Sequence, residues 1–203
     1  MTQLKSRLMI VNILCLMLMF SVPDGWAMEP QDGDQEGNVL SDGKLTKEEL
    51  AAAMLIAEKD LTGMFKAAMG KVESELEQSG IFGPGAWMTM KDRDLKSVKL
   101  SQEAVGAPPS AKLQMFRASL RSLARHNKID AVLLVYPGTI TKEGTKERVV
   151  VVEHEHRLGV SGIKLVPLDL DRGKATFGAP MSQDKDFQIF YEQRSKSKAA
   201  PNS

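Results

Sequence analysis

The segment Arg148-Val-Val-Val-Val-Glu-His-Glu-His156 decides the fold that this sequence predicts. Four consecutive valines are stiff at χ1 and pack well on a pleated surface, so they favour a β-strand. Because apolar side chains occupy both parities, we expect both faces of this strand to be covered. Ile129-Asp-Ala-Val-Leu-Leu-Val-Tyr136 has the same pattern. These two segments should therefore be neighbours at the centre of one sheet.

Shorter segments are predicted to complete the sheet. Ala86–Met90 and Leu95–Leu100 alternate like strands on either side of a polar turn, which predicts a hairpin. Ile163–Leu170 and Lys174–Phe177 follow further turns, and Phe187–Tyr191 is a candidate edge strand. Short turns between successive strands require antiparallel neighbours, so the predicted sheet is antiparallel.

The first predicted helix begins at Thr46 and ends at Ser79-Gly80. Thr46 and Glu49 have the spacing of a capping box. Apolar residues then recur every three or four positions from Leu50 to Leu76, as one buried helix face requires. Glycine just after the last periodic residue favours the end of the helix.

Two functional patterns overlap this helix. Asp42-Gly-Lys-Leu-Thr-Lys-Glu-Glu49 is like the second half of a calcium-binding loop, but Leu40 stands where that loop needs a carboxylate. We therefore favour the helix cap. Met54, Met64 and Met69 fit core packing, and they also fit an adaptable partner groove because methionine is flexible and polarisable.

The second predicted helix opens with Ser110 as its N-cap, and it carries basic residues on one face. Arg117, Arg121 and Arg125 are four residues apart, and like charges at this spacing repel each other mildly. Two interpretations stay open. The arginines pair with acidic residues on neighbouring elements, or they dock an anionic partner such as a lipid headgroup, a cell-wall polymer or the chain's own acidic segment.

In chain order, the elements predict the α+β fold class. We expect two layers, with an antiparallel sheet of about five strands packed by two amphipathic helices in the order α-β-β-α-β-β-β. This order is similar to that of roadblock- and profilin-like domains. The analogy is one of topology alone, because the chain has no diagnostic motif of either family.

The N-terminus is typical of an exported protein. Lys5 and Arg7 precede the apolar run Leu8–Phe20, and small residues at Gly25 and Ala27 fit a cleavage site. The run is shorter than the roughly 20 residues of a membrane-spanning helix. We predict a signal peptide over residues 1–27, a flexible acidic leader over 28–45, a single α+β domain over 46–192 and a disordered tail over 193–203.

Export would change the composition of the mature chain. Cys15, the only cysteine, lies in the predicted signal peptide, so the mature protein would contain no disulfide. Removal of this segment takes the formal net charge from +1 to zero. A neutral chain does not favour steering toward nucleic acid. We expect a periplasmic or extracellular protein without a stable membrane span after signal cleavage.

His154 and His156 are the only pair with the character of metal ligands. Residues two apart on a strand share a face, and the flanking glutamates point to the opposite one. Zinc needs at least a third protein ligand, for which Asp169 or Asp171 is the candidate. We favour the other interpretation, in which the strand leaves the covered part of the sheet after Val152 and Glu153 to Arg157 forms a polar, water-facing extension.

The chain contains no phosphate-binding glycine loop, no nucleophile elbow and no thiol nucleophile in its mature part. We therefore expect a non-enzymatic binding or interaction module that needs no cofactor. Its expected partner is an envelope protein or a second copy of itself. The alternative is a metal-dependent hydrolase that uses His154 and His156.

Overall fold

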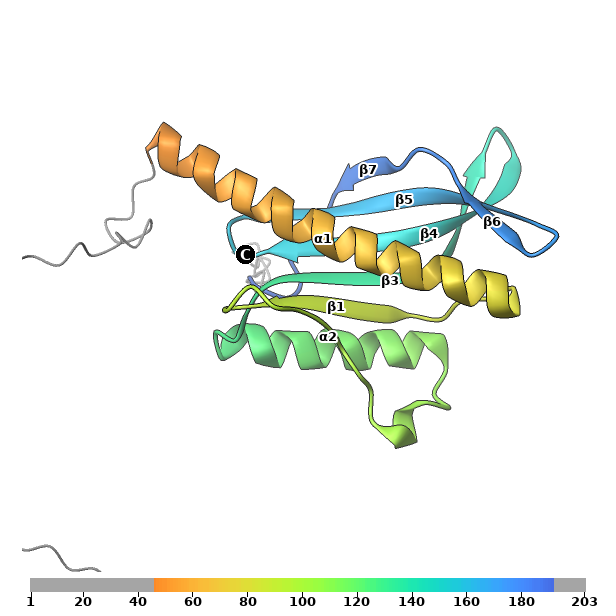
Figure 1. Ribbon diagram of the computed structural model, residues 1–203, viewed down its shortest axis with the longest axis horizontal. Coiled ribbons are helices and arrows are strands. Elements are labelled where there is room, and N and C mark those ends of the chain that lie inside the picture. Colours follow the sequence, from red (N-terminus) through yellow and green to blue (C-terminus); the bar gives the residue numbers. More distant parts are fainter. Residues whose placement is uncertain (1–45, 192–203) are drawn as a thin grey trace, which may run out of the picture. The chain divides into compact units, whose positions relative to one another are not determined.

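The computed structural model describes residues 46–191, which lie within one compact unit, Asp42–Ser203. The predicted signal peptide (1–27), leader (28–45) and tail (193–203) lie outside the described residues. The elements, shown in Figure 1, are α1 (Lys47–Ser79), β1 (Gly85–Met90), β2 (Leu95–Ser97), the short 3₁₀ helix η1 (Gln102–Ala104), α2 (Pro109–Arg125), β3 (Ile129–Lys142), β4 (Thr145–His156), β5 (Val160–Asp171), β6 (Lys174–Phe177) and β7 (Met181–Asp184). The α+β class is confirmed.

All strands form one antiparallel, strongly curled sheet in the order β2-β1-β3-β4-β5-β6. As predicted, β3 and β4 are neighbours at its centre, and they pair continuously from Ala131↔His156 to Lys142↔Thr145. β7 was not predicted. It pairs with residues 162–165 of β5, while β6 pairs with residues 168–171, so β6 and β7 follow one another along β5. The sheet therefore exceeds the expected five strands.

The two helices contact opposite faces of the sheet, so the two-layer prediction was wrong. Leu133 and Val135 of β3 pack in the cluster that contains Met64 and Leu76 of α1. Their neighbours Val132 and Leu134 pack in the cluster that contains Leu120 of α2. Because successive side chains of a strand point to opposite faces, the layers are α1, sheet and α2. Fully burying an aliphatic side chain stabilises the fold by about 1.5–3 kcal/mol relative to leaving it exposed. β3 buries aliphatic side chains on both of its faces.

The predicted ends of α1 are confirmed. The Thr46 side chain accepts from the Glu49 N–H, the Glu49 carboxylate accepts from the Thr46 N–H, and Gly80 takes a left-handed φ of 73°. The predicted apolar face is buried in the middle and second half of the helix. Near the start, Leu50 and Met54 stay half exposed. Figure 1 shows why, because the first turns of α1 extend past the strands.

Two local predictions were wrong. Ser110 is not the N-cap of α2, because Pro108 holds that position and Pro109 begins the helix. Proline suits a first helical position, where its missing N–H would have no intrahelical acceptor. Phe187–Tyr191 is not a strand. Backbone N–H groups in this segment instead donate to a side chain of β4, as described below.

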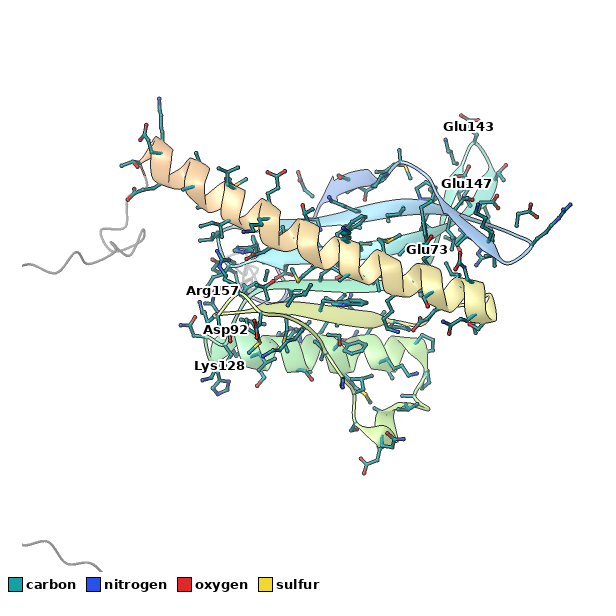
Figure 2. The ribbon with its side chains drawn as sticks, viewed as in Figure 1. Glu73, Asp92, Lys128, Glu143, Glu147 and Arg157 are labelled. Carbon is teal, nitrogen blue, oxygen red and sulfur yellow. The ribbon has the colours of Figure 1, made fainter. Side chains whose placement is uncertain are left out.

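Charged residues lie at both ends of the sheet. Figure 2 shows Glu143 and Glu147 at the β3–β4 hairpin, and Asp92 and Arg157 at the opposite end. No helix among residues 46–191 has both the length and the apolar character needed to cross a membrane.

Candidate functional site

An apolar groove of about 630 Å³ lies between the first half of α1 and the sheet. Most of its wall is aliphatic or aromatic, and its polar side chains are few. The lining residues are Ala51, Met54, Leu55, Glu58, Leu61, Thr62, Phe65, Leu133, Val152, His154, Val160 and Lys164. They come from α1, β3, β4 and the first part of β5.

The groove exists because α1 is longer than the surface that it covers. Its 33 residues span about 50 Å at 1.5 Å per residue. The second half buries large side chains such as Met64 and Leu76. In the first half the buried residues are the small Ala53 and Ala57, while Leu55 is 67% exposed. Of the three methionines considered from the sequence, Met54 lines the groove and Met64 lies in the core.

His154 forms part of the groove wall, and Gly162 makes room for it. The two residues are paired across β4 and β5. A Cβ at Gly162 would lie 3.0 Å from Cε1 of His154 and 3.2 Å from the Gln183 carbonyl oxygen. A side chain at position 162 would therefore require the imidazole or the Gln183 backbone to shift by a few tenths of an ångström. Gly162 lies inside β5.

His154 is held in its neutral form. Burial lowers the pKa of His154 below its usual value because it penalises the charged ring, and the positive charge of Lys164 lowers it further. Lys164 lies over the Phe65 ring, with Nζ 5.3 Å from the ring centroid. The groove thus offers one neutral imidazole and one ammonium group on the same wall.

His156 is on the same face of β4, but its ring nitrogens are both engaged. Nδ1 accepts from the Leu158 N–H at 3.1 Å, so in the neutral ring the proton is on Nε2 and donates to Asp60 at 3.2 Å. Asp60 also accepts from Arg93 at 2.5 Å. Burial lowers the pKa of His156, and the hydrogen bond to Asp60 opposes this effect only in part. His156 therefore ties β4 to α1.

The third ligand considered from the sequence is too far from the histidines. Gly162 is opposite His154, and Asp169 is seven residues further along β5, which corresponds to roughly 23 Å. Asp171, the last residue of β5, is exposed beside Arg172. Within residues 46–191, no three His, Cys, Asp or Glu side chains are grouped closely enough to hold a metal ion.

The glutamates that alternate with these histidines are buried under the α2 side of the sheet. Glu153 accepts from Arg117 at 2.8 Å and from the Tyr136 hydroxyl at 2.6 Å. Burial raises the pKa of Tyr136, and its hydrogen bond to Glu153 raises it further. The expected opposite orientation of the glutamates is correct. The water-facing extension was wrong, because Glu153, Glu155 and His156 are all buried.

Glu155 fixes the segment after β7 to the protein. It is only 2% exposed, and it accepts from the backbone N–H groups of Gln188, Ile189 and Phe190 at 2.7, 2.9 and 3.2 Å. Lys185 adds an ion pair at 3.0 Å. These bonds replace the strand pairing that the sequence had predicted for this segment.

A second hollow, of about 590 Å³, lies between α2 and this C-terminal segment. It brings together the three arginines singled out from the sequence. The lining residues are Gln114, Arg117, Arg121, Arg125, Phe187, Gln188 and Tyr191. We call it the basic pocket. Pairing of the arginines with acidic neighbours is supported by Arg117, which pairs with the buried Glu153. Docking of an anionic partner also keeps support, because arginines line the pocket.

Several residues of these sites were missed in the sequence. Lys164 and Lys185 follow no motif, and Asp60 reads as a polar residue on an exposed helix face. The sequence did contain one indication for Lys164. Side chains two residues apart on a strand point to the same face, so Lys164 shares a face with Val166, which packs against α1. Which face that is depends on strand register, which no local pattern gives.

Comparison with known proteins found no relative. No family model, no curated protein and no solved structure matches the chain. The geometry of the apolar groove is therefore the basis of the functional proposal.

Proposed function

We propose that this chain is an exported, non-enzymatic binding module that holds an amphipathic molecule in the α1 groove. The observation that carries the proposal is the groove, whose volume is about 630 Å³ and whose wall is mainly apolar. Pockets of roughly 300–1,000 Å³ with few, well-placed polar groups are typical of small-molecule sites. The N-terminal sequence supports export to the periplasm or the extracellular space.

Lys164 supports an anionic group on one end of the ligand. Its ammonium group contacts the Phe65 ring and has no ion pair within the described part of the chain. His154 adds a neutral ring that can donate or accept a hydrogen bond. Glu58, which also lines the groove, would repel the anionic end and so restrict it to the Lys164 side. An alkyl chain with a terminal carboxylate has this chemistry.

A binding module fits the histidines better than the alternative of a metal-dependent hydrolase. A hydrolase built on His154 and His156 would need a free nitrogen on each ring. His156 would have to give up its bond to Leu158 or to Asp60. The order of elements, similar to roadblock- and profilin-like domains up to the third long strand, is compatible with a binding role but does not establish it.

Titration calorimetry with dodecanoate tests this proposal. We expect dodecanoate to bind and dodecyltrimethylammonium, which has the same chain, to bind more weakly. Lys164→Met should weaken dodecanoate binding by at least roughly tenfold, because a hydrogen bond to a charged group contributes about 1.5–3 kcal/mol. Lys174→Met, at an exposed position on β6, is the matched control and should not change the affinity.

A second pair of variants tests the apolar wall. Leu55→Glu places a charge in the groove without touching the core, and it should abolish dodecanoate binding. Val105→Glu changes a side chain of similar exposure, 58% against 67%, outside the groove. Absence of dodecanoate binding, or equal loss in the Leu55 and Val105 variants, would contradict the proposed function.

A further inference from the structure

The basic pocket on the α2 side of the sheet has a chemistry of its own. Arg117, Arg121 and Arg125 point from one face of α2 into a hollow of about 590 Å³, and the described lining contains no carboxylate. Successive arginines at this spacing are about 6 Å apart along the helix axis. The hollow is on the opposite side of the sheet from the apolar groove, and the proposed function does not use it.

Two of the guanidinium groups are held in place by the fold. Arg117 donates to Glu153 at 2.8 Å, and Arg121 donates from Nε to the Gln188 carbonyl oxygen at 2.8 Å. Side chains that are already ordered lose less conformational entropy when a ligand binds. The pocket is therefore prepared for an acceptor before the ligand arrives.

The charges around the pocket leave Arg121 without a carboxylate. Glu153 and Glu155 are balanced by Arg117 and Lys185. Arg121 makes its hydrogen bond to a neutral carbonyl group, and it has no ion pair with any of residues 46–191. In addition, Nε of Arg117 is buried and finds no acceptor among the described residues. A buried donor without an acceptor is costly.

We propose that the basic pocket binds the phosphate group of an organic phosphate. Guanidinium groups match phosphate oxygens with paired hydrogen bonds, which a single ammonium group cannot do. The hollow is larger than a phosphate alone requires. Phe187 and Tyr191 supply an aromatic surface for the organic part. Their rings pack edge to face, with the ring centroids 4.8 Å apart.

The same phosphate chemistry has two sources, a free phosphorylated metabolite and the headgroup of an anionic phospholipid. Pyrophosphate is the probe for the first, and vesicles of phosphatidylcholine containing phosphatidylglycerol are the probe for the second. Titration calorimetry of the full chain with pyrophosphate at low salt should show binding that weakens as sodium chloride is added, because salt screens the charges. Co-sedimentation measures binding to the vesicles.

Arg121→Gln should weaken binding of whichever probe binds by at least tenfold. Arg172→Gln, at a fully solvated position in the β5–β6 turn, is the matched control and should leave binding unchanged. Arg121→Lys keeps the positive charge but loses the paired N–H donors of the guanidinium group, so we expect a loss of affinity smaller than that of Arg121→Gln. It also replaces the glutamine variant if circular dichroism shows that Arg121→Gln does not fold.

Loss in Arg121→Gln with pyrophosphate alone assigns the pocket to a soluble phosphate, and loss with the vesicles assigns it to a lipid headgroup. Binding of neither probe, or an equal loss in Arg172→Gln, overturns the inference. The dodecanoate titration uses a different face of the sheet, so the two proposals fail independently.

Discussion

On the α1 side of β4, His154 lines an open groove, whereas on the α2 side the next residue, Glu155, is buried beneath the C-terminal segment. Both are polar residues in a strand covered on two faces. Glu155 has four donors within 3.2 Å, three of them backbone N–H groups. His154 instead lines the groove beside Lys164, and its ring makes a hydrogen bond to the backbone of Val152. The two residues differ in how many hydrogen bonds they make within the protein. Glu155 makes four and stabilises the fold, whereas His154 makes fewer and is available to a ligand.

The same comparison applies within one face. His156 and His154 share the α1 side, but only His154 is in the groove. His156 uses both nitrogens to connect β4, α1 and the chain after β4. A polar residue in a strand thus has to be judged by its hydrogen bonds, because its type and spacing are the same in both cases.

The largest expected effect is at Glu155. Glu155→Gln keeps the size of the side chain but removes its charge, so Lys185 loses a buried partner and one backbone N–H group faces an amide donor. Breaking a buried ion pair costs about 3–5 kcal/mol, and we expect a loss near the lower end because Glu153 still lies 3.6 Å from Lys185. Urea unfolding monitored by tryptophan fluorescence measures it.

Glu143→Gln is the control for this substitution. Glu143 is exposed at the tip of the β3–β4 hairpin, as Figure 2 shows, and its replacement should change the unfolding free energy by less than about 0.5 kcal/mol. If Glu155→Gln were as mild as Glu143→Gln, the segment after β7 would not depend on the buried carboxylate.

A smaller effect is expected at Gly162. Gly162→Ala places a Cβ 3.0 Å from the His154 ring, so the ring or the strand has to move. We expect a loss of about 1–2 kcal/mol, as for other overpacked sites, together with weaker dodecanoate binding. Urea unfolding and calorimetry measure the two quantities.

Gly63→Ala is the control for this substitution, and it should change the unfolding free energy in the opposite direction. Gly63 lies within α1, and a Cβ there has no neighbour within 4 Å. Alanine should stabilise the helix by about 0.5–1 kcal/mol relative to glycine. A destabilising Gly63→Ala, or a neutral Gly162→Ala, would contradict the packing described for these two positions.

The smallest and most gradual effect is expected from pH. Burial lowers the folded-state pKa of both His154 and His156 below the usual 6.5. The unfolded chain therefore binds more protons as the pH falls below about 6.5, and the unfolding free energy should decrease until the folded-state pKa values are reached. Chemical unfolding at several pH values measures this slope.

His156→Gln sharpens the pH experiment. It removes one of the two rings whose pKa burial lowers, so the dependence of the unfolding free energy on pH below 6.5 should become weaker, although the variant is less stable overall. An unchanged slope in His156→Gln would mean that His156 takes up its proton equally well in the folded protein.

The sequence by itself determined the two helices, the long strands and their order, but not β7. The valine run of β4, the capping box of Thr46 and Glu49, and the left-handed Gly80 depend on residues that are near one another in the chain. Local sterics and short-range hydrogen bonds fix such features, so patterns of period two and 3.6 predict them. The alternation in β4 also separated the histidines from the glutamates correctly.

Only the tertiary structure decided which polar residues belong to a site. That α1 and α2 lie on opposite faces, that Gly162 is opposite His154, and that residues 188–190 donate to Glu155 are contacts between residues far apart in the chain. Their energies depend on strand register and on where each helix docks, and a one-residue slip in register would exchange the two faces. The groove and the basic pocket are consequences of that docking, so no local pattern could have predicted them.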